Sequence, residues 1–449
     1  MKTKTILLFK TAIILISLNF PMRIVAQENN RTQWSLTDCI DFAHEQNIEV
    51  RSSILGIKSN EISYSNAKSQ KLPSVSAAVS QNFNWQKGED ATGATTGYSG
   101  NSSNNYQVSS SVSVYNGFKL NNKIKQAEIE LEYGKYNSET IKENVSLQIL
   151  NAFLQVLYSE EQVKNAEKQI ESTTEQLQLA EERLNLSIIS RSDYLQVKSE
   201  LASEKLTLAN AKSNFEISKI SLMQLMELPV SDDFDIVRPD LEKELNPMRE
   251  PDAVTIYEQA LVIKPQIKTA ELNRESALYD EKIARADLYP SVFANAGLGT
   301  GYSSSFSSQN YFSQLNNSVN PSIGLSLSIP IFQKNQVKNN VKQAQIAIEN
   351  ADLNQINIKN QLRKNIEQAC ADVSSAQIQY EAGKEKFDAT NESYLLAEEK
   401  FKNGLINSVD FLVIKNTSIL AESDLLQSKF NLVFSYKILD FYAGIPISL

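Results

Sequence analysis

The residues that could carry out chemistry are few and scattered. The chain of 449 residues has one histidine, His44, and two cysteines, Cys39 and Cys370. No set of cysteines and histidines has the spacing of a zinc site, and neither cysteine has a counterpart in the other half of the chain. We expect His44 to be solvated in a polar helix and the cysteines to pack as small apolar side chains. We also expect no enzyme activity, no metal site and no cofactor.

Two short segments resemble ligand sites but have simpler explanations. The glycine-rich segment 297–301 has the composition of a phosphate loop, but it lies in a predicted strand and opens no helix. The acidic segment 232–235 could attract cations, but such a run in a linker is usually a solvated stretch of charge.

Asp193 and Asp410 each stand at the start of a predicted helix. A carboxylate there accepts hydrogen bonds from free backbone N–H groups and faces the positive end of the helix dipole, so capping accounts for both residues. A second role stays open, because a symmetric assembly would turn either aspartate into a ring of charge at a pore. Asp410 is the stronger candidate for such a gate.

Each of these aspartates follows a turn of small and aliphatic residues. The turns lie at the far ends of helical hairpins, where exposed aliphatic side chains have little of their own chain to pack against. We therefore predict that both turns dock the coiled-coil tip of a partner. The predicted docking residues are Ser187, Ile188, Ile189 and Ser190 in the first turn, and Gly404, Leu405, Ile406, Asn407 and Ser408 in the second.

An internal repeat places these features in register. The sequence matches itself at one offset of 217 residues, the separation between Ala43 and Ala260, and Pro73 and Pro290 repeat at the same distance. The predicted organisation is a signal peptide (1–26), a first repeat (27–230), an acidic, proline-bearing linking segment (231–251) and a second repeat (252–449).

Each repeat contains a very long helix. From Leu120 and from Val337, apolar or small residues recur at spacings of three and four, without a break, for about 67 residues. A helix of that length spans roughly 100 Å, so the molecule must be elongated. We predict shorter helices on either side, at 36–71 and 252–288 before the strands, and from Asp193 and Asp410 after the turns. The shorter helices should stack end to end beside the long one.

Between the first helix and the long helix of each repeat, the pattern has a period of two. It predicts two strands of about ten residues per repeat, apolar on one face and rich in serine, asparagine and glycine on the other. This alternation is typical of transmembrane β-strands, although a soluble antiparallel sheet also shows it. The aromatic residues Phe83, Trp85, Tyr106 and Tyr302 near strand ends could form interfacial girdles. The predicted lipid-facing residues are Val75, Val79, Phe83, Trp85, Val112, Val114, Ile323, Leu325, Leu327 and Ile329.

Four strands cannot close a membrane barrel, since the smallest such barrels have about eight. Open sheet edges are not tolerated in lipid. The pattern therefore requires several copies of the chain to pool their strands.

The N-terminus has the layout of a secretory signal peptide. Lys2, Lys4 and Lys10 precede an apolar stretch, and residues 24–26 end it with Ala26. Removal of these lysines and Arg23 would change the formal charge from −9 to −13. Such an acidic chain repels phosphate backbones, so nucleic acid is excluded as a partner.

The doubled order of strands, long helix, turn and returning helix resembles the TolC-like outer membrane efflux protein family over essentially the whole mature chain. In the family, the sequence of the turn is roughly Gly-Leu-x-Ser followed by Asp and Leu. Here residues 187–190 precede Asp193 and Leu195, and residues 404–408 precede Asp410 and Leu412. The strand-to-helix junctions 114–118 and 329–332 add to the resemblance. Ser187 stands in place of the first glycine, and Asn407 in place of a frequent serine.

The resemblance implies a homotrimer with an all-antiparallel, twelve-stranded barrel in outer membrane lipid, continued by a coiled-coil helical tunnel in the periplasm that the returning helices close. It implies work as the exit duct of a tripartite efflux or type I secretion system. The partners would be a periplasmic adaptor (membrane fusion) protein and, indirectly, an inner-membrane transporter. The alternative is a soluble periplasmic coiled-coil scaffold or adaptor. A passive porin would not need helices of roughly 100 Å.

Overall fold

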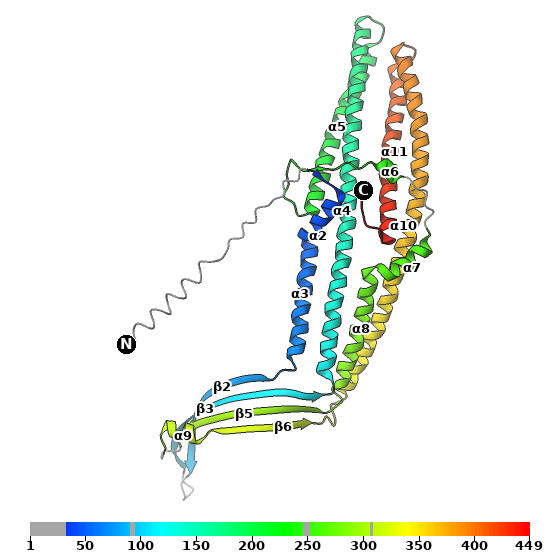
Figure 1. Ribbon diagram of the computed structural model, residues 1–449. Helices are drawn as coiled ribbons and strands as arrows, with labels where there is room; N and C mark the ends of the chain where they lie inside the picture. Colours follow the sequence, from blue (N-terminus) through cyan, green and yellow to red (C-terminus); the bar gives the residue numbers. More distant parts are fainter. Residues whose placement is uncertain (1–32, 90–94, 246–251, 306–308) are drawn as a thin grey trace.

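The protein is elongated, with a sheet at one end and two helical hairpins at the other (Figure 1). The computed structural model describes residues 33–89, 95–245, 252–305 and 309–449, and the predicted signal peptide lies outside them. The two halves of the chain lie side by side along the long axis, because α4 (Lys119–Asn185) of the first half contacts α8 (Pro265–Ala286) of the second.

Both long helices have the predicted length. α4 (Lys119–Asn185) and α10 (Gln336–Lys402) each contain 67 residues, and each is followed by a returning helix of 35 residues, α5 (Arg191–Leu225) or α11 (Ser408–Tyr442). The ladder of apolar and small residues is the buried stripe of α4 and includes Ala127, Val145, Val156 and Thr173. The predicted periodicity is therefore confirmed as the packing face.

The helix before the strands is broken in each half, so the prediction of single helices at 36–71 and 252–288 was wrong. The first half has α2 (Leu36–Gln46) and α3 (Ile48–Ser69), and the second has α7 (Ala253–Ile263) and α8 (Pro265–Ala286). The Asn47 side chain accepts hydrogen bonds from the N–H groups of the next helix and so starts it afresh. Lys264 precedes Pro265 and is extended, because proline disfavours helical backbone in the residue before it.

The shorter helices flank the long ones as expected. α3 lies along the sheet-side part of α4 and α5 along its other part, and α8 and α11 do the same for α10 (Figure 1). Each half thus forms two helical columns that rise from the sheet. Within the described residues, no helix combines the length and the hydropathy needed to cross a membrane.

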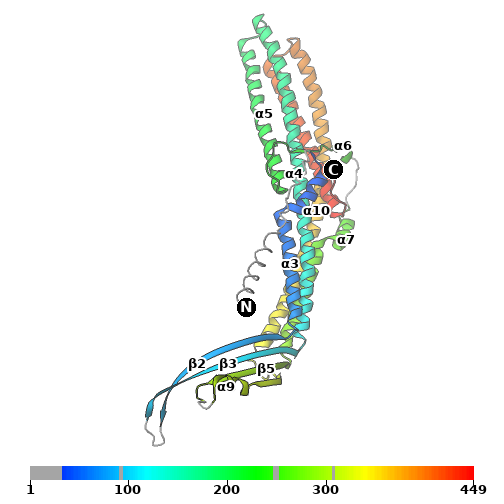
Figure 2. The same cartoon turned by 60° about the vertical axis from the view of Figure 1, so that its left-hand side comes forward.

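The strands form one antiparallel sheet in the order β2-β3-β5-β6. Their bounds are β2 (Ser74–Glu89), β3 (Thr95–Asn116), β5 (Ser291–Ser303) and β6 (Asn320–Ser328). β2 and β3 are longer than the expected ten residues, and Figure 2 shows them extending past the end of β5. A short helix that the sequence analysis did not predict, α9 (Tyr311–Asn317), connects β5 to β6.

The main core lies where the linking segment meets the N-terminal part of the chain. β1 (Gln33–Trp34) pairs in parallel with β4 (Asp235–Ile236), and α6 (Leu241–Glu244) follows. Phe234 and Ile236 are buried in the same cluster as Trp34. The acidic segment 232–235 is therefore not simply a solvated run: Phe234 belongs to the core, and Asp235 forms an ion pair with Arg238 at 2.9 Å.

His44 is half-buried and hydrogen-bonded within the protein, in contrast to the expectation of a solvated side chain. Its Nε2 lies 2.8 Å from the Ser146 hydroxyl and 3.2 Å from the Lys142 carbonyl oxygen, so it ties α2 to α4. Cys39 and Cys370 are buried free thiols in two different hydrophobic clusters, as the packing interpretation predicted. Burial raises the pKa of Cys39 to about 12.

Lys264, at the break between α7 and α8, joins three helices. Its side chain is 4% exposed, its Nζ lies 3.2 Å from Glu143 of α4, and it stands 3.2 Å from the centre of the Phe441 ring of α11. Burial lowers the pKa of Lys264 and raises that of Glu143, and each is opposed by the charge of the other. These two contacts hold the break between α7 and α8 against α4 and against the C-terminal end of α11.

Candidate functional site

The two turns at the helical tips share one backbone conformation. In the first turn, the N–H of Ile188 donates to the Arg183 carbonyl and the N–H of Ser187 to the Leu184 carbonyl, each at 2.9 Å. Leu405 and Gly404 make the equivalent bonds in the second turn. This is a Schellman ending, which needs a left-handed residue. Ser187 has φ +57° and Gly404 has φ +72°, so serine occupies a position that suits glycine.

The helices that leave the turns begin with side-chain caps. The Ser190 hydroxyl accepts from the N–H of Asp193, while the Asp193 carboxylate accepts from the Ser190 N–H at 3.2 Å and closes a capping box. In the second tip, the Asn407 side chain caps the helix and its amide donates to Asp410 at 2.9 Å. Both aspartates therefore stand three residues inside the N-cap rather than at it.

The two tips are joined to each other. The Ser408 hydroxyl donates a 2.8 Å hydrogen bond to the Asp193 carboxylate, and Arg183 of α4 donates to the carbonyl oxygens of Phe401 and Lys402 at the end of α10. Hydrogen bonds from Ser190 and Ser408 lower the pKa of Asp193. Asp410, in contrast, is solvent-exposed within the protomer.

The predicted docking residues divide into exposed and packed side chains. Ile188 is 64% exposed and Leu405 73% exposed, whereas Ile189 and Ile406 are half-buried. Ile406 packs against the cluster that contains Phe401 and Phe411, and Ser408 is only 2% exposed. The prediction that all four aliphatic side chains are exposed was wrong, because two of them are half-buried. The residues that Ile406 packs against belong to α10 and α11 of its own hairpin. Ser408 serves the tip-to-tip hydrogen bond.

A buried ion pair below the tips was not predicted from the sequence. The ammonium group of Lys415 in α11 lies 2.7 Å from the Glu204 carboxylate in α5 and also contacts the Thr173 hydroxyl of α4, and both charged side chains are less than a tenth exposed. The second carboxylate oxygen of Glu204 is buried without a hydrogen-bond partner in the described part of the chain. The sequence does contain a signal for this pair, because each charged residue falls within the buried stripe of its helix. Lys415 lies between the buried residues Phe411 and Ser418 of α11, and Glu204 follows the buried Leu201 of α5.

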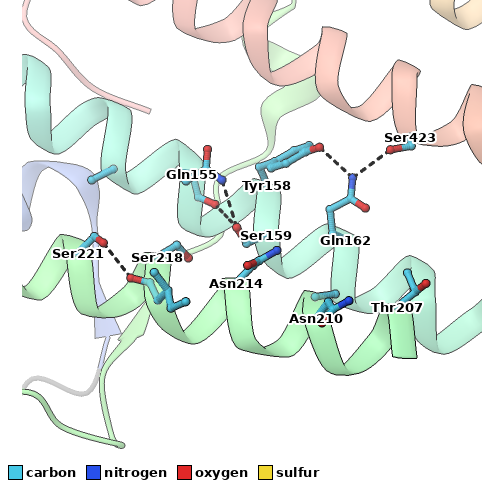
Figure 3. Close-up of a pocket in the computed structure, with 13 residues that line it drawn as sticks. Gln155, Tyr158, Ser159, Gln162, Thr207, Asn210, Asn214, Ser218, Ser221 and Ser423 are labelled. Atoms are coloured by element: carbon cyan, nitrogen blue, oxygen red, sulfur yellow. Dashed lines mark hydrogen bonds between the residues drawn. The ribbon is translucent and has the colours of Figure 1, made fainter. Parts of the chain in front are cut away.

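A polar groove of about 490 Å³ runs between α4 and α5 at the middle of the helical part (Figure 3). Amide and hydroxyl side chains line it, including Asn210 and Asn214, and none of its lining residues is charged. Gln162 donates to the Tyr158 hydroxyl at 3.1 Å and to Ser423 of α11 at 3.4 Å. Such a surface is suited to contact with water or with an uncharged polar partner.

The sheet gathers the alternating strands into one apolar face. Directly paired residues of antiparallel strands share a face. Val79 pairs with Tyr106, Val108 with Leu298, and Ala294 with Leu325, so the apolar residues of all four strands lie on the same side. A bulge between Ser113 and Tyr115 interrupts the register, and Tyr115 rather than Val114 pairs with Val292. We call this side the apolar face. Its residues at the helix-side end of β6, Leu325 and Leu327, are 76% and 62% exposed in the protomer.

All but one of the predicted lipid-facing residues thus lie on strands of one sheet, and Ile329 directly follows the end of β6. Nine of the ten are strongly exposed, and Val112 is half-buried. The glycine-rich segment 297–301 lies within β5, as expected, and opens no helix. In the described residues, no three histidine, cysteine, aspartate or glutamate side chains group as a metal site.

Solved structures show the same fold. A membrane protein from Pseudomonas aeruginosa matches with a TM-score of 0.77 and 16% identity, over 91% of this chain and 90% of its own. The CmeC outer membrane channel of Campylobacter jejuni matches with 0.76 and 17%, over 91% and 85%. The MtrE outer membrane channel of Neisseria gonorrhoeae, in its open state, matches with 0.74 and 18%, over 92% and 89%. No curated protein matches in sequence.

A match to a protein-family model identifies the family of the chain and its role. The model of the outer membrane efflux protein family matches residues 39–227 and 256–444, two ranges related by the repeat offset found in the sequence. The match covers most of the chain and favours the channel over the soluble scaffold. It places the sheet in the outer membrane and the helical columns in the periplasm, as parts of an exit duct. The chain belongs to the outer membrane efflux protein family.

Proposed function

We propose that three copies of the chain pool their sheets into one closed barrel of twelve strands, continued by a tunnel of helices in the periplasm. The observation that supports this most directly is the four-stranded sheet with one continuous apolar face. β2 and β6 are its edges, and in the described residues neither pairs on its outer side. An apolar sheet with two open edges is unstable in lipid, and closure with further copies removes the edges.

The proposal assigns the two faces of the sheet. The apolar face contacts outer membrane lipid, and the opposite face, with Ser80, Ser326 and Ser328, lines a water-filled lumen. The hairpin from 288 to 333 contains no charged residue, which suits a segment that crosses hydrocarbon. The mature chain begins after the signal peptide at 1–26, since a barrel protein must be exported.

The proposed partners bind at the helical tips. Family members work as trimers with periplasmic adaptors and inner-membrane pumps. In this chain, Ile188 and Leu405 are the exposed aliphatic side chains of two blunt, neighbouring turns. We assign the adaptor contact to this pair, and the inner-membrane transporter acts through the adaptor. The chain then functions as a conduit without a catalytic site.

Cross-linking in mild detergent tests the assembly. A ladder that stops at a trimer is expected, and a stable, folded monomer in detergent would overturn the proposal. The adaptor contact is tested separately with Leu405→Glu, and Asn403→Ala in the same turn is the control. Loss of efflux with an intact trimer is expected for Leu405→Glu alone. Full efflux from that variant would place the adaptor elsewhere.

A further inference from the structure

The short helix α9 lies across the apolar face at the ends of β5 and β6 that are farthest from the helical columns (Figure 1). Tyr106 and Thr300 are a directly paired couple on that face, and Tyr302 is two residues farther along β5. The Tyr311 hydroxyl lies 2.7 Å from the Tyr106 hydroxyl, and the Tyr311 ring packs at a tilt against that of Tyr302, with the ring centroids 4.8 Å apart. The Thr300 hydroxyl donates to the Leu315 carbonyl at 2.5 Å. The helix therefore covers the side of the sheet opposite the serine-rich face.

The helix is held firmly in this place. Gln314 is 5% exposed, and its side-chain oxygen accepts from the Ser303 N–H at 2.9 Å. The Asn310 side chain caps the helix by accepting from Ser313 at 2.8 Å, and the Ser318 hydroxyl donates to the Gly301 carbonyl at 3.1 Å. These bonds pair polar groups of α9 and of its flanking residues within the protein, which lowers the cost of placing them near lipid.

The outward surface of α9 has a different character. Phe312 is 79% exposed, and its ring packs edge-on against Tyr311. No charged residue lies between 309 and 320, and Val319 is 51% exposed. A large exposed phenylalanine beside buried amides and tyrosine hydroxyls has the amphipathic composition found at membrane–water interfaces.

The position along the membrane normal agrees with an interface. Val292 and Tyr302 are ten residues apart on β5, which corresponds to about 34 Å along the strand and, at a tilt of about 40°, to roughly 26 Å along the normal. The apolar band of outer-membrane barrels is about 25 Å tall. If Val292 lies near the periplasmic boundary, then Tyr302 and α9 lie at the outer one.

We propose that α9 is a lipid-contact element on the outside of the barrel, with Phe312 inserted among the outermost acyl chains of the external leaflet and Tyr106, Tyr302 and Tyr311 at head-group level. The occupant of this surface is lipid, because the apolar face that α9 continues is the membrane-facing side of the sheet. The assignment rests on the proposed orientation of the barrel.

Tryptophan quenching tests the contact in the assembled protein. The chain has two tryptophans. Trp85→Phe removes the one on the sheet and leaves Trp34, which is 7% exposed in the helical core, as an internal reference. In this background, Phe312→Trp is reconstituted into bilayers whose phospholipids carry bromine near the head-group end of the acyl chain. We expect a blue-shifted emission that the brominated lipid quenches and that aqueous acrylamide reaches only weakly.

A second variant separates this inference from the proposed barrel. Leu325→Trp, in the same background, reports whether the helix-side part of the apolar face is in lipid. If lipid quenches Leu325→Trp but acrylamide alone quenches Phe312→Trp, α9 stands in water and the inference is wrong while the barrel stands. If neither probe responds to either quencher, a neighbouring protomer covers α9 and the apolar face, and both proposals fail.

Discussion

The Ser408 hydroxyl donates a 2.8 Å hydrogen bond to the Asp193 carboxylate and so links two turns that are more than two hundred residues apart in the chain. Ser408 is 2% exposed, which means that the bond lies under the surface of the tips rather than on it. The two hairpins of one protomer thus end as a single unit. A partner that binds one tip acts on both.

This hydrogen bond makes the tips sensitive to acid. The pKa of Asp193 is lowered in the folded protein by Ser190 and Ser408, so its contribution to stability is complete above the ordinary pKa of an aspartate and is lost as the pH falls through the lowered value. We expect amide hydrogen exchange at residues 187–193 to accelerate at acidic pH. Asp193→Asn should remove that acid-dependent step, and an unchanged pH profile in the variant would contradict the assignment.

Ser187 carries a backbone strain that a single substitution can relieve. Its φ of +57° costs a non-glycine residue about 1 kcal/mol. Ser187→Gly should therefore raise the stability of the first tip by about that amount. Gly404→Ala is the matched change in the opposite direction, because nothing lies within 4 Å of an added Cβ and only the backbone is strained. Thermal unfolding followed by circular dichroism measures both, and equal midpoints would rule out the strain.

Replacing only one member of the Lys415–Glu204 ion pair should strongly destabilise the folded protein. Lys415→Met leaves the Glu204 carboxylate buried without its counter-charge, and such changes destabilise by about 3–5 kcal/mol. The double variant with Glu204→Leu removes both charges and should recover most of that loss. A double-mutant cycle in urea measures the coupling. Additive effects of the two changes would show that the charges do not depend on each other.

The two faces of the sheet should respond differently to a charge. Leu325 lies on the apolar face and Ser326 on the other. A lipid-facing arginine costs about 2–4 kcal/mol at the midplane and less toward either interface, so Leu325→Arg should reduce trimer assembly in the outer membrane while Ser326→Arg should not. Heat-modifiable migration on gels measures assembly. Equal yields of assembled trimer from both variants would contradict the proposed assignment of the two faces.

Asp410 is the residue whose gate role can be separated from its local role. Asn407 caps the helix, and among the described residues Asp410 accepts from the Asn407 amide alone, so Asp410→Asn should leave stability almost unchanged. If three copies of Asp410 form a ring at the closed entrance, the same variant should lose cation selectivity and block by divalent cations in planar bilayers. Unchanged selectivity and block would leave Asp410 as a surface residue near the cap.

Much of the architecture is local in origin and could be predicted from the sequence. The period of three and four residues from Leu120 continues without a helix breaker, and this alone determines a 67-residue helix. The period of two in Val75, Ala77 and Val79 determines a strand with an apolar side, because successive side chains point to opposite faces. Pro265 indicates the helix break at Lys264 in the sequence, but the helical pattern on both sides of it favoured a single helix.

The tertiary structure decided which distant residues meet. Ser146 satisfies His44 across 102 positions, and Lys415 finds Glu204 across 211, so neither contact follows from local spacing. Ile406 is aliphatic and lies in a turn, yet the two helices of its own hairpin bury part of it. Periodicity fixes the face on which a side chain lies, whereas burial and hydrogen bonding depend on the neighbour that the fold brings to that face. The sheet shows the same division: each strand carried its own apolar side, and only the pairing of β3 with β5 combined them into one surface.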